Sequence, residues 1–368
     1  MRIIKIAGMI LLIVILFIIA FIVIALLFLK FYPSVGRLPD DAQKQVFKKE
    51  NTLYYDDSFH NEKEGSLISG EGYPASERRV PEQTLKAETP GLLTDAKDDD
   101  LTFTWLGHSS FLIQLGNKNL LFDPVLGGRT SPVSFAGPKR FSEIPITAAQ
   151  MPEIDVLLLS HDHYDHLDYD TIKEIRSKVK KFIVPLGVDT ILKGWGVEAD
   201  KIIVLNWWET VEIDGTIYTL TPSQHFTGRN PLKRNSTLWG GYYINNEYHR
   251  IYYTGDGGYS DAFKNVNERL GTPDLMLAEC GQYDPSWSGV HMFPEETVQA
   301  AVDADASWMI PVHWGAFCIC NHAWDDPIIR VTAEAENRNL SIATPRIGQT
   351  VDYDRIEIYN EKWWEAYR

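Results

Sequence analysis

The chain has 368 residues, enough for one large hydrophobic core or for two half-domains that share one. Its formal net charge of −15 argues against nucleic-acid binding, because a phosphate-binding surface should be basic. The three cysteines, Cys280, Cys318 and Cys320, give no disulfide framework. Cys318 and Cys320, with His322 after them, could form a thiolate metal site, although buried thiols beside a loop more often explain such a cluster.

The N-terminal stretch of residues 6–29 is apolar and uncharged, between a short tail with Arg2 and Lys5 and the closing Lys30. A helix needs about 20 apolar residues to cross a bilayer, and the stretch is longer than the core of a cleaved signal peptide. We therefore predict a signal anchor over residues 1–30, rather than a signal peptide or a buried core helix. The five-residue tail is easily left in the cytoplasm, so we expect an extracytoplasmic catalytic domain, although basic residues after the helix oppose this orientation.

Residues 31–100 are polar, with scattered Pro, Gly and charged residues and no sustained periodicity, which predicts a linker and a loosely structured arm. From residue 101 the pattern changes to alternating strands. Three strands over residues 102–106, 110–115 and 119–122 form a predicted meander, in which His108 lies in the first turn and Asp123 follows the third strand.

A dense group of metal-binding residue types follows the apolar stretch 156–159, which reads as a buried strand. Imidazole nitrogens and carboxylate oxygens at this density suit zinc or a similar divalent ion. Because alternate side chains of an extended segment point the same way, the first two histidines can reach one ion while the turning loop reaches a second. The residues, within the sequence SHDHYDHLDYD, are His161, His163, Asp165 and His166.

Three later strands each deliver one further ligand-type residue just past the strand end, where a rigid element can position it. His225 follows the predicted strand 217–221, Asp256 follows 250–254, and His313 follows 308–312. Strand, loop and helix alternate twice, which suggests two similar halves. The other predicted strands cover residues 182–185, 202–205, 212–213, 239–244 and 274–278, and the predicted helices cover residues 169–180, 188–193, 261–270, 294–305 and 325–338.

The pattern His-x-His-x-Asp-His at a strand end resembles the signature of the metallo-β-lactamase-fold hydrolases, and His225, Asp256 and His313 follow in that superfamily's order. The resemblance implies an α/β fold over residues 101–368, an αββα four-layer sandwich preceded here by one transmembrane helix. It also implies two Zn²⁺ ions per chain. One ion is then held by His161, His163 and His225, the other by Asp165, His166 and His313, and Asp256 bridges the two.

Such a site would keep open positions on each ion, and a hydroxide shared by two zinc ions is available at neutral pH. No serine nucleophile is then needed, and the chain has no G-x-S-x-G elbow around the Ser109 region. His108 and Asp123 are candidates for orienting the ligand histidines from behind.

Within the superfamily, residues 101–346 resemble the branch of phospholipases D that hydrolyse N-acylphosphatidylethanolamine. The shared features are Tyr164 inside the metal motif, the segment 237–240 with Trp239, residues 252–259, and His291 before a Pro-Glu-Glu helix start. Residues 54–61 (YYDDSFHN) resemble a segment that precedes the catalytic domain in bacterial members. The resemblance implies hydrolysis of a membrane-lipid phosphodiester, which releases phosphatidic acid and an N-acylethanolamine.

By this resemblance Asp165, Asp256 and His291 are the catalytic residues, and His291, Trp239 and Tyr164 contact substrate. His291 would bind or polarise substrate oxygens, or protonate the leaving alcohol. The expected partners are a membrane lipid and the bilayer, while the oligomeric state stays open. Two alternatives remain on the same fold: a lactonase for phosphorylated sugar lactones, and a non-catalytic zinc-binding scaffold. The apolar N-terminus favours the lipid substrate, and the complete ligand set disfavours the scaffold.

Overall fold

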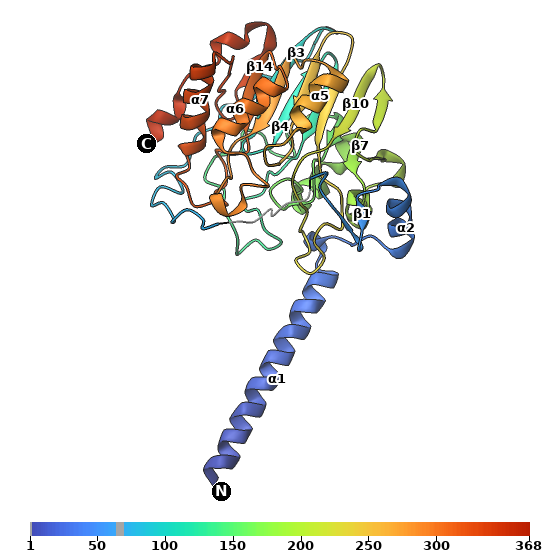
Figure 1. Cartoon of the computed structure of the whole chain (residues 1–368), viewed down its shortest axis with the longest axis vertical. Helices are drawn as coiled ribbons and strands as arrows, with labels where there is room; N and C mark the ends of the chain where they lie inside the picture. Colours follow the sequence, from blue (N-terminus) through green and yellow to red (C-terminus); the bar gives the residue numbers. More distant parts are fainter. Residues whose placement is uncertain (1, 64–69) are drawn as a thin grey trace.

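The computed structural model describes residues 2–63 and 70–368, and in it a single long helix projects from a folded body (Figure 1). This helix, α1 (Arg2–Phe31), is long and apolar enough over Lys5–Phe31 to cross a membrane, and none of its most apolar stretch is buried against the protein. At a rise of about 1.5 Å per residue, the helix spans roughly 40 Å over the 27 residues of this stretch. Its length and composition agree with the predicted anchor, and membrane insertion itself stays a prediction.

Two mixed sheets pack face to face around the main core. The larger sheet has the order β15-β3-β4-β5-β6-β7-β8 and the smaller has the order β14-β13-β12-β11-β10-β9. The strands of the larger sheet are β3 (Leu101–Trp105), β4 (Phe111–Leu115), β5 (Lys118–Phe122), β6 (Ile154–Leu158), β7 (Val179–Pro185), β8 (Ile202–Leu205) and β15 (Thr350–Asp352). Those of the smaller sheet are β9 (Thr210–Ile213), β10 (Thr216–Thr221), β11 (Gly241–Asn245), β12 (Arg250–Tyr253), β13 (Leu275–Glu279) and β14 (Trp308–Val312).

Helices cover the outer face of each sheet, which completes the predicted αββα sandwich (Figure 1). The helices on the larger sheet are α3 (Tyr169–Ile175) and α4 (Val188–Gly194), and those on the smaller sheet are α5 (Ala262–Leu270), α6 (Pro294–Asp303) and α7 (Asp326–Arg338). The strand sequences explain these layers. In β4, Phe111 and Ile113 face the core between the sheets, while Leu112 faces the helices, so a strand buried on both sides is apolar throughout.

The helix predicted over residues 169–180 is shorter in the structure. It ends at Ile175, and a short 3₁₀ turn leads into β7 at Val179, which pairs with Ile154 of β6. The side chain of Lys178 donates hydrogen bonds to the carbonyl groups of Ala148 and Met151, and these bonds turn the chain toward the sheet. Sheet pairing therefore overrides the helical pattern of the last five residues.

The segment predicted as a loosely structured arm packs against the catalytic domain over its described residues; residues 64–69 of it lie outside the described part. It forms α2 (Asp41–Glu50) and the hairpin β1 (Tyr54–Tyr55) and β2 (Ser58–Phe59). Although large apolar side chains such as Leu38, Val46 and Val80 are exposed, four others are buried in the main core, namely Phe47, Tyr54, Phe59 and Leu85. They are too widely spaced to give a periodic pattern, which is why the sequence resembles a linker.

Candidate metal centre and its pocket

Strand direction brings the ligand-type residues to one edge of the sandwich. Strands β5 and β6 are parallel, and β10, β12 and β14 also run in a common direction. The loops after these strands therefore leave from the carboxyl ends of strands, and there they meet. The seven predicted ligands that the structure brings together are His161, His163, Asp165, His166, His225, Asp256 and His313.

The Oδ2 atom of Asp256 lies at the centre of this cluster. It is 3.0 Å from His166 Nε2, 3.3 Å from His313 Nε2, 3.8 Å from His161 Nε2 and 3.9 Å from His225 Nε2. One side of the cluster contains His161, His163 and His225, and the other contains His108, Asp165, His166 and His313. Asp256 thus lies between two groups of donors, in the arrangement that the sequence predicts for a bridging ligand.

The donor set fits divalent metal ions. His166 Nε2, His313 Nε2 and Asp256 Oδ1 are buried without a hydrogen-bond partner among the described residues, and a buried unpaired polar atom costs about 1–3 kcal/mol. His163 Nδ1 also lies 2.9 Å from His161 Nε2 and 3.3 Å from His225 Nε2. At these distances two rings can share either a proton in a hydrogen bond or a metal ion, and nitrogen with carboxylate oxygen is a typical zinc ligand set.

Hydrogen bonds behind three of the ligand histidines fix the directions in which their rings point. Asp123 Oδ2 lies 2.8 Å from His166 Nδ1, the carbonyl oxygen of Val290 lies 2.9 Å from His225 Nδ1, and Ser109 Oγ lies 2.9 Å from His313 Nδ1. Asp123 therefore lies where the sequence predicts. His108 also lies behind the site, but its Nε2 atom is 2.9 Å from Asp165 Oδ2, so its partner is the carboxylate rather than a ligand histidine.

Burial and charge set the protonation states of the cluster. Burial lowers the pKa of His161, His225 and His313 well below the usual value, so these imidazoles are neutral. Burial alone would raise the pKa of Asp256, but the neighbouring histidines, His166 first, hold that pKa well below its usual range. Burial lowers the pKa of His166, but Asp256 and Asp165 outweigh this effect and raise that pKa well above its usual value. Neutral imidazole and ionised carboxylate are the forms that bind metal ions, so metal binding would displace a proton from His166.

A cavity of about 380 Å³ opens onto the cluster and gives a substrate access to it. Tyr164 and His291 both line this cavity, and their contact with substrate stays a prediction. The remaining wall is largely apolar, and among the described residues that line it none is Lys or Arg. Its apolar members are Pro138, Phe226, Trp287, Val290 and Ile319.

Trp239 does not line this cavity, although the sequence predicts a substrate contact for it. Its side chain is fully buried in the main core, and its indole N–H donates to the carbonyl oxygen of Ser223 at 2.9 Å. Trp207 packs edge-on against it. Trp239 is therefore a structural residue under the loop that carries His225, and the prediction of a substrate contact is wrong in this structure.

Two residues of the site are not singled out by the sequence analysis. Glu279 ends strand β13, is fully buried, and places one carboxylate oxygen 3.5 Å from His291 Nδ1. Asn61 holds the backbone of His225 with two hydrogen bonds, in which its Oδ1 accepts from His225 N–H and its Nδ2 donates to the His225 carbonyl. In the sequence, Glu279 is marked only as a charged residue at the end of an apolar strand. Asn61 is marked only as the last residue of the motif at 54–61.

Residues 118–314 match the family model described as the beta-lactamase superfamily domain. An uncharacterised protein of Mycobacterium tuberculosis is 39% identical over 256 residues, 68% of each chain. The N-acyl-phosphatidylethanolamine-hydrolyzing phospholipase D 1 of Caenorhabditis elegans is 36% identical over 254 residues, 66% of this chain and 71% of that one. The metallo hydrolase Igni18 of Ignicoccus hospitalis shares the fold, with a TM-score of 0.53 at 19% identity over 69% of this chain and 98% of its own.

The chain therefore belongs to the β-lactamase superfamily and has the fold of its metallo-hydrolases. The predicted resemblance to the branch that hydrolyses N-acylphosphatidylethanolamine is confirmed by the identity to the C. elegans enzyme.

Proposed function

We propose that the chain is a membrane-anchored dinuclear zinc hydrolase, a phosphodiesterase of the phospholipase D type that cleaves N-acylphosphatidylethanolamine-like lipids. The observation that carries the proposal is the apolar cavity directly over the metal cluster. The name of the C. elegans relative supports the same substrate class.

The cavity lining favours a lipid over a phosphorylated sugar lactone. A sugar phosphate carries a dianion away from the reacting bond, and such a group usually needs Arg or Lys to bind it. The described residues that line the cavity include neither. A phosphodiester has a single negative charge at the reacting centre, which faces the cluster, and its apolar chains suit walls such as Phe226 and Trp287.

The chain's own residues have separable roles in this reaction. When bound, the two zinc ions would supply Lewis-acid stabilisation and an activated water. His161, His163 and His225 would hold one ion, and Asp165, His166 and His313 the other, with Asp256 shared between them. The hydrogen bonds behind His166, His225 and His313, together with the burial of the cluster, keep these donors in place before substrate arrives.

His291 and Tyr164 are the residues that we assign to substrate rather than to metal. The Glu279 carboxylate lies on the Nδ1 side of His291, so the Nε2 atom is left to donate to a phosphoryl or leaving oxygen. The Tyr164 hydroxyl donates to the carbonyl oxygen of Arg229 at 3.1 Å, so its ring is fixed as one wall of the cavity. Asp165 is held by His108 and so links the second group of donors to the β3–β4 turn.

The proposal is tested with full-length protein, loaded with zinc and assayed on vesicles that contain N-acylphosphatidylethanolamine. Mass spectrometry should find phosphatidic acid and an N-acylethanolamine, and elemental analysis should find about two zinc ions per chain. Diacylglycerol as the lipid product would contradict the phospholipase D bond specificity. Turnover of a phosphosugar lactone without turnover of lipid would support the lactonase alternative, and two bound ions without turnover of either would support the scaffold.

A further inference from the structure

We propose that the catalytic domain carries a second membrane contact of its own, an interfacial surface that docks onto a phospholipid bilayer. This interfacial surface consists of the loops 127–139 and 226–235 beside the end of α1. The inference rests on the proposed membrane anchorage by α1, and it adds an orientation: the metal cavity would face the bilayer rather than the solvent.

The residues directly after α1 are fixed to the catalytic domain by hydrogen bonds that are buried or partly buried. Ser34 Oγ donates to the carbonyl oxygen of Pro132 at 2.6 Å, and Arg229 Nε donates to the carbonyl oxygen of Ser34 at 2.8 Å. The indole N–H of Trp195 donates to the carbonyl oxygen of Pro33 at 2.7 Å. Since Pro132 and Arg229 belong to the two loops, a membrane around α1 lies next to both.

Each loop presents a large apolar side chain to solvent. Phe135 is 82% exposed and Leu232 is 62% exposed. Both loops lie at the end of the domain from which α1 leaves (Figure 1). Exposed aromatic and aliphatic side chains at loop tips insert into the region between headgroups and acyl chains, where burial of apolar area stabilises the contact.

The charge around these tips complements phospholipid headgroups. Residues 124–142 contribute the accessible cations Arg129 and Lys139, and residues 226–240 contribute Lys233 and Arg234, whereas Arg140 and Arg229 are buried. Neither stretch contains Asp or Glu. This is unusual in a chain with 50 acidic and 35 basic residues. Cations near a bilayer surface attract its anionic lipids over about one Debye length.

The opposite edge of the sandwich is acidic, so the domain is polarised. The β4–β5, β9–β10 and β11–β12 turns lie at the amino ends of the strands whose carboxyl ends carry the ligands. Asp98, Asp214 and Glu247 line a common surface hollow beside these turns, with Lys118 as its one cation among the described residues. An anionic membrane would repel this edge and attract the interfacial surface, which gives the same orientation as the fixed end of α1.

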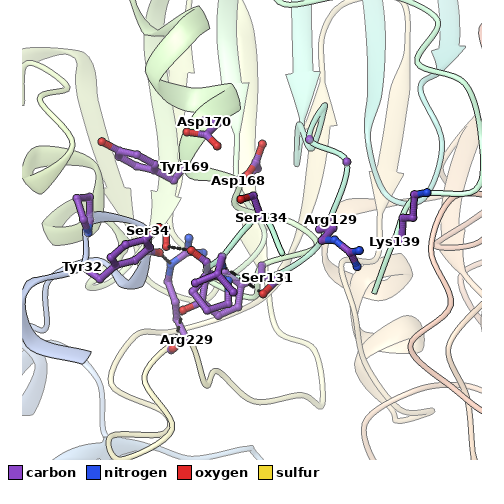
Figure 2. A pocket seen from close by; sticks show the side chains of 16 residues that line it. Tyr32, Ser34, Arg129, Ser131, Ser134, Lys139, Asp168, Tyr169, Asp170 and Arg229 are labelled. Carbon is purple, nitrogen blue, oxygen red and sulfur yellow. Dashed lines mark hydrogen bonds between the residues drawn. The ribbon is translucent and has the colours of Figure 1, made fainter. Parts of the chain in front are cut away.

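A polar cavity of about 650 Å³ lies within the interfacial surface. Figure 2 shows Tyr32 and Ser34 on one side of this cavity and Arg129 and Lys139 on the other, and the carboxylates of Asp168 and Asp170 also line it. Tyr164 lines both this cavity and the metal cavity. A lipid headgroup at the level of the polar cavity is therefore one side chain away from the metal cluster, while Phe135 extends toward the acyl chains.

The test measures membrane depth directly in full-length protein. Phe135→Cys and Leu232→Cys, each labelled with a thiol-reactive fluorophore, are reconstituted into vesicles of phosphatidylcholine with a minority of phosphatidylglycerol, with and without brominated acyl chains. Tyr248→Cys is the matched control, because Tyr248 is 49% exposed in the β11–β12 turn at the acidic edge. Labelled wild-type protein corrects for the native thiol of Cys318, which is the only partly exposed cysteine among the described residues.

We expect severalfold stronger quenching at positions 135 and 232 than at position 248. Equal quenching at all three positions would overturn the inference, because α1 alone would then tether a freely turning domain. Stronger quenching at positions 135 and 232 without lipid hydrolysis would support the interfacial surface and contradict the proposed lipid substrate. Lipid hydrolysis with equal quenching at all three positions would support the proposed substrate and contradict the interfacial surface. The two proposals can therefore be refuted independently.

Discussion

Substitution of Asp123 by Asn should weaken metal binding although Asp123 is not in the ligand cluster. The two carboxylate oxygens of Asp123 accept four hydrogen bonds in a buried site. Oδ1 accepts from Ser160 N–H at 2.7 Å, and Oδ2 accepts from Ser160 Oγ at 2.5 Å, from Tyr253 OH at 2.7 Å and from His166 Nδ1 at 2.8 Å. An amide has the same shape but only one acceptor oxygen.

The structure sets the size of the effect. In its better orientation the Asn oxygen faces the three donors at the Oδ2 position, and its NH₂ group faces the N–H of Ser160. One buried backbone donor is then unpaired, which costs about 1–3 kcal/mol of folding free energy. The His166 ring also loses its charged partner, and loss of such a partner typically lowers metal affinity by about 10–100-fold.

Zinc affinity is measured by competition with a fluorescent chelator, and folding free energy by denaturant unfolding of the metal-free protein. Asp170→Asn is the matched control, because it removes the same charge from an exposed position four residues after His166. Wild-type zinc affinity in Asp123→Asn would refute the argument that the hydrogen bond behind His166 sets the metal site. Equal weakening in Asp170→Asn would show that the total charge matters instead.

Asp256→Asn removes the charge at the centre of the cluster and should lose metal and essentially all hydrolysis; elemental analysis that still finds two ions at full activity would contradict the bridging role. His291→Ala should keep both ions and slow lipid turnover by about 10²–10³-fold, with a smaller loss on bis-nitrophenyl phosphate, whose leaving group needs no proton. Loss of zinc in His291→Ala would instead make His291 a ligand. Asn61→Ala leaves the backbone of His225 unpaired and should lower the unfolding free energy by about 1–3 kcal/mol, whereas Asn117→Ala at an exposed turn should not.

Much of the fold could be predicted because strand and ligand signals coincide in this chain. Continuous apolar stretches such as residues 156–159 mark strands buried on both faces, and each ligand follows the end of one of them. Parallel strands end at the same edge, so the order of strand ends predicts the meeting of His225, Asp256 and His313 with the metal motif. The split into two donor groups also follows from the alternation of His161 and His163.

The remaining features depend on contacts between residues far apart in the sequence. Tryptophan is a residue type that often contacts substrate, and only the packing of Trp239 against Trp207 in the folded protein shows that it belongs to the hydrophobic core. Asn61 lies in a polar arm without periodicity, and its role becomes visible when the arm folds over His225, 164 residues later. Glu279 looks like the ordinary end of a strand until His291 packs beside it. No local pattern encodes these pairs.

The metal cluster is held between the two sheets by the backbone as well as by side chains. His108 N–H donates to the carbonyl oxygen of Trp314, and His313 N–H donates to the carbonyl oxygen of His108, both at 2.9 Å, so the turn after β3 pairs with the loop after β14. His108, Asp123 and His313 all have positive φ angles, of 56°, 38° and 69°, which are strained for non-glycine residues. Such conformations persist only where surrounding contacts fix them, and here the inter-sheet pairing does so. The ligands are thus positioned by the closure of the sandwich, which holds the Nε2 atoms of four histidines within 4 Å of Asp256 Oδ2.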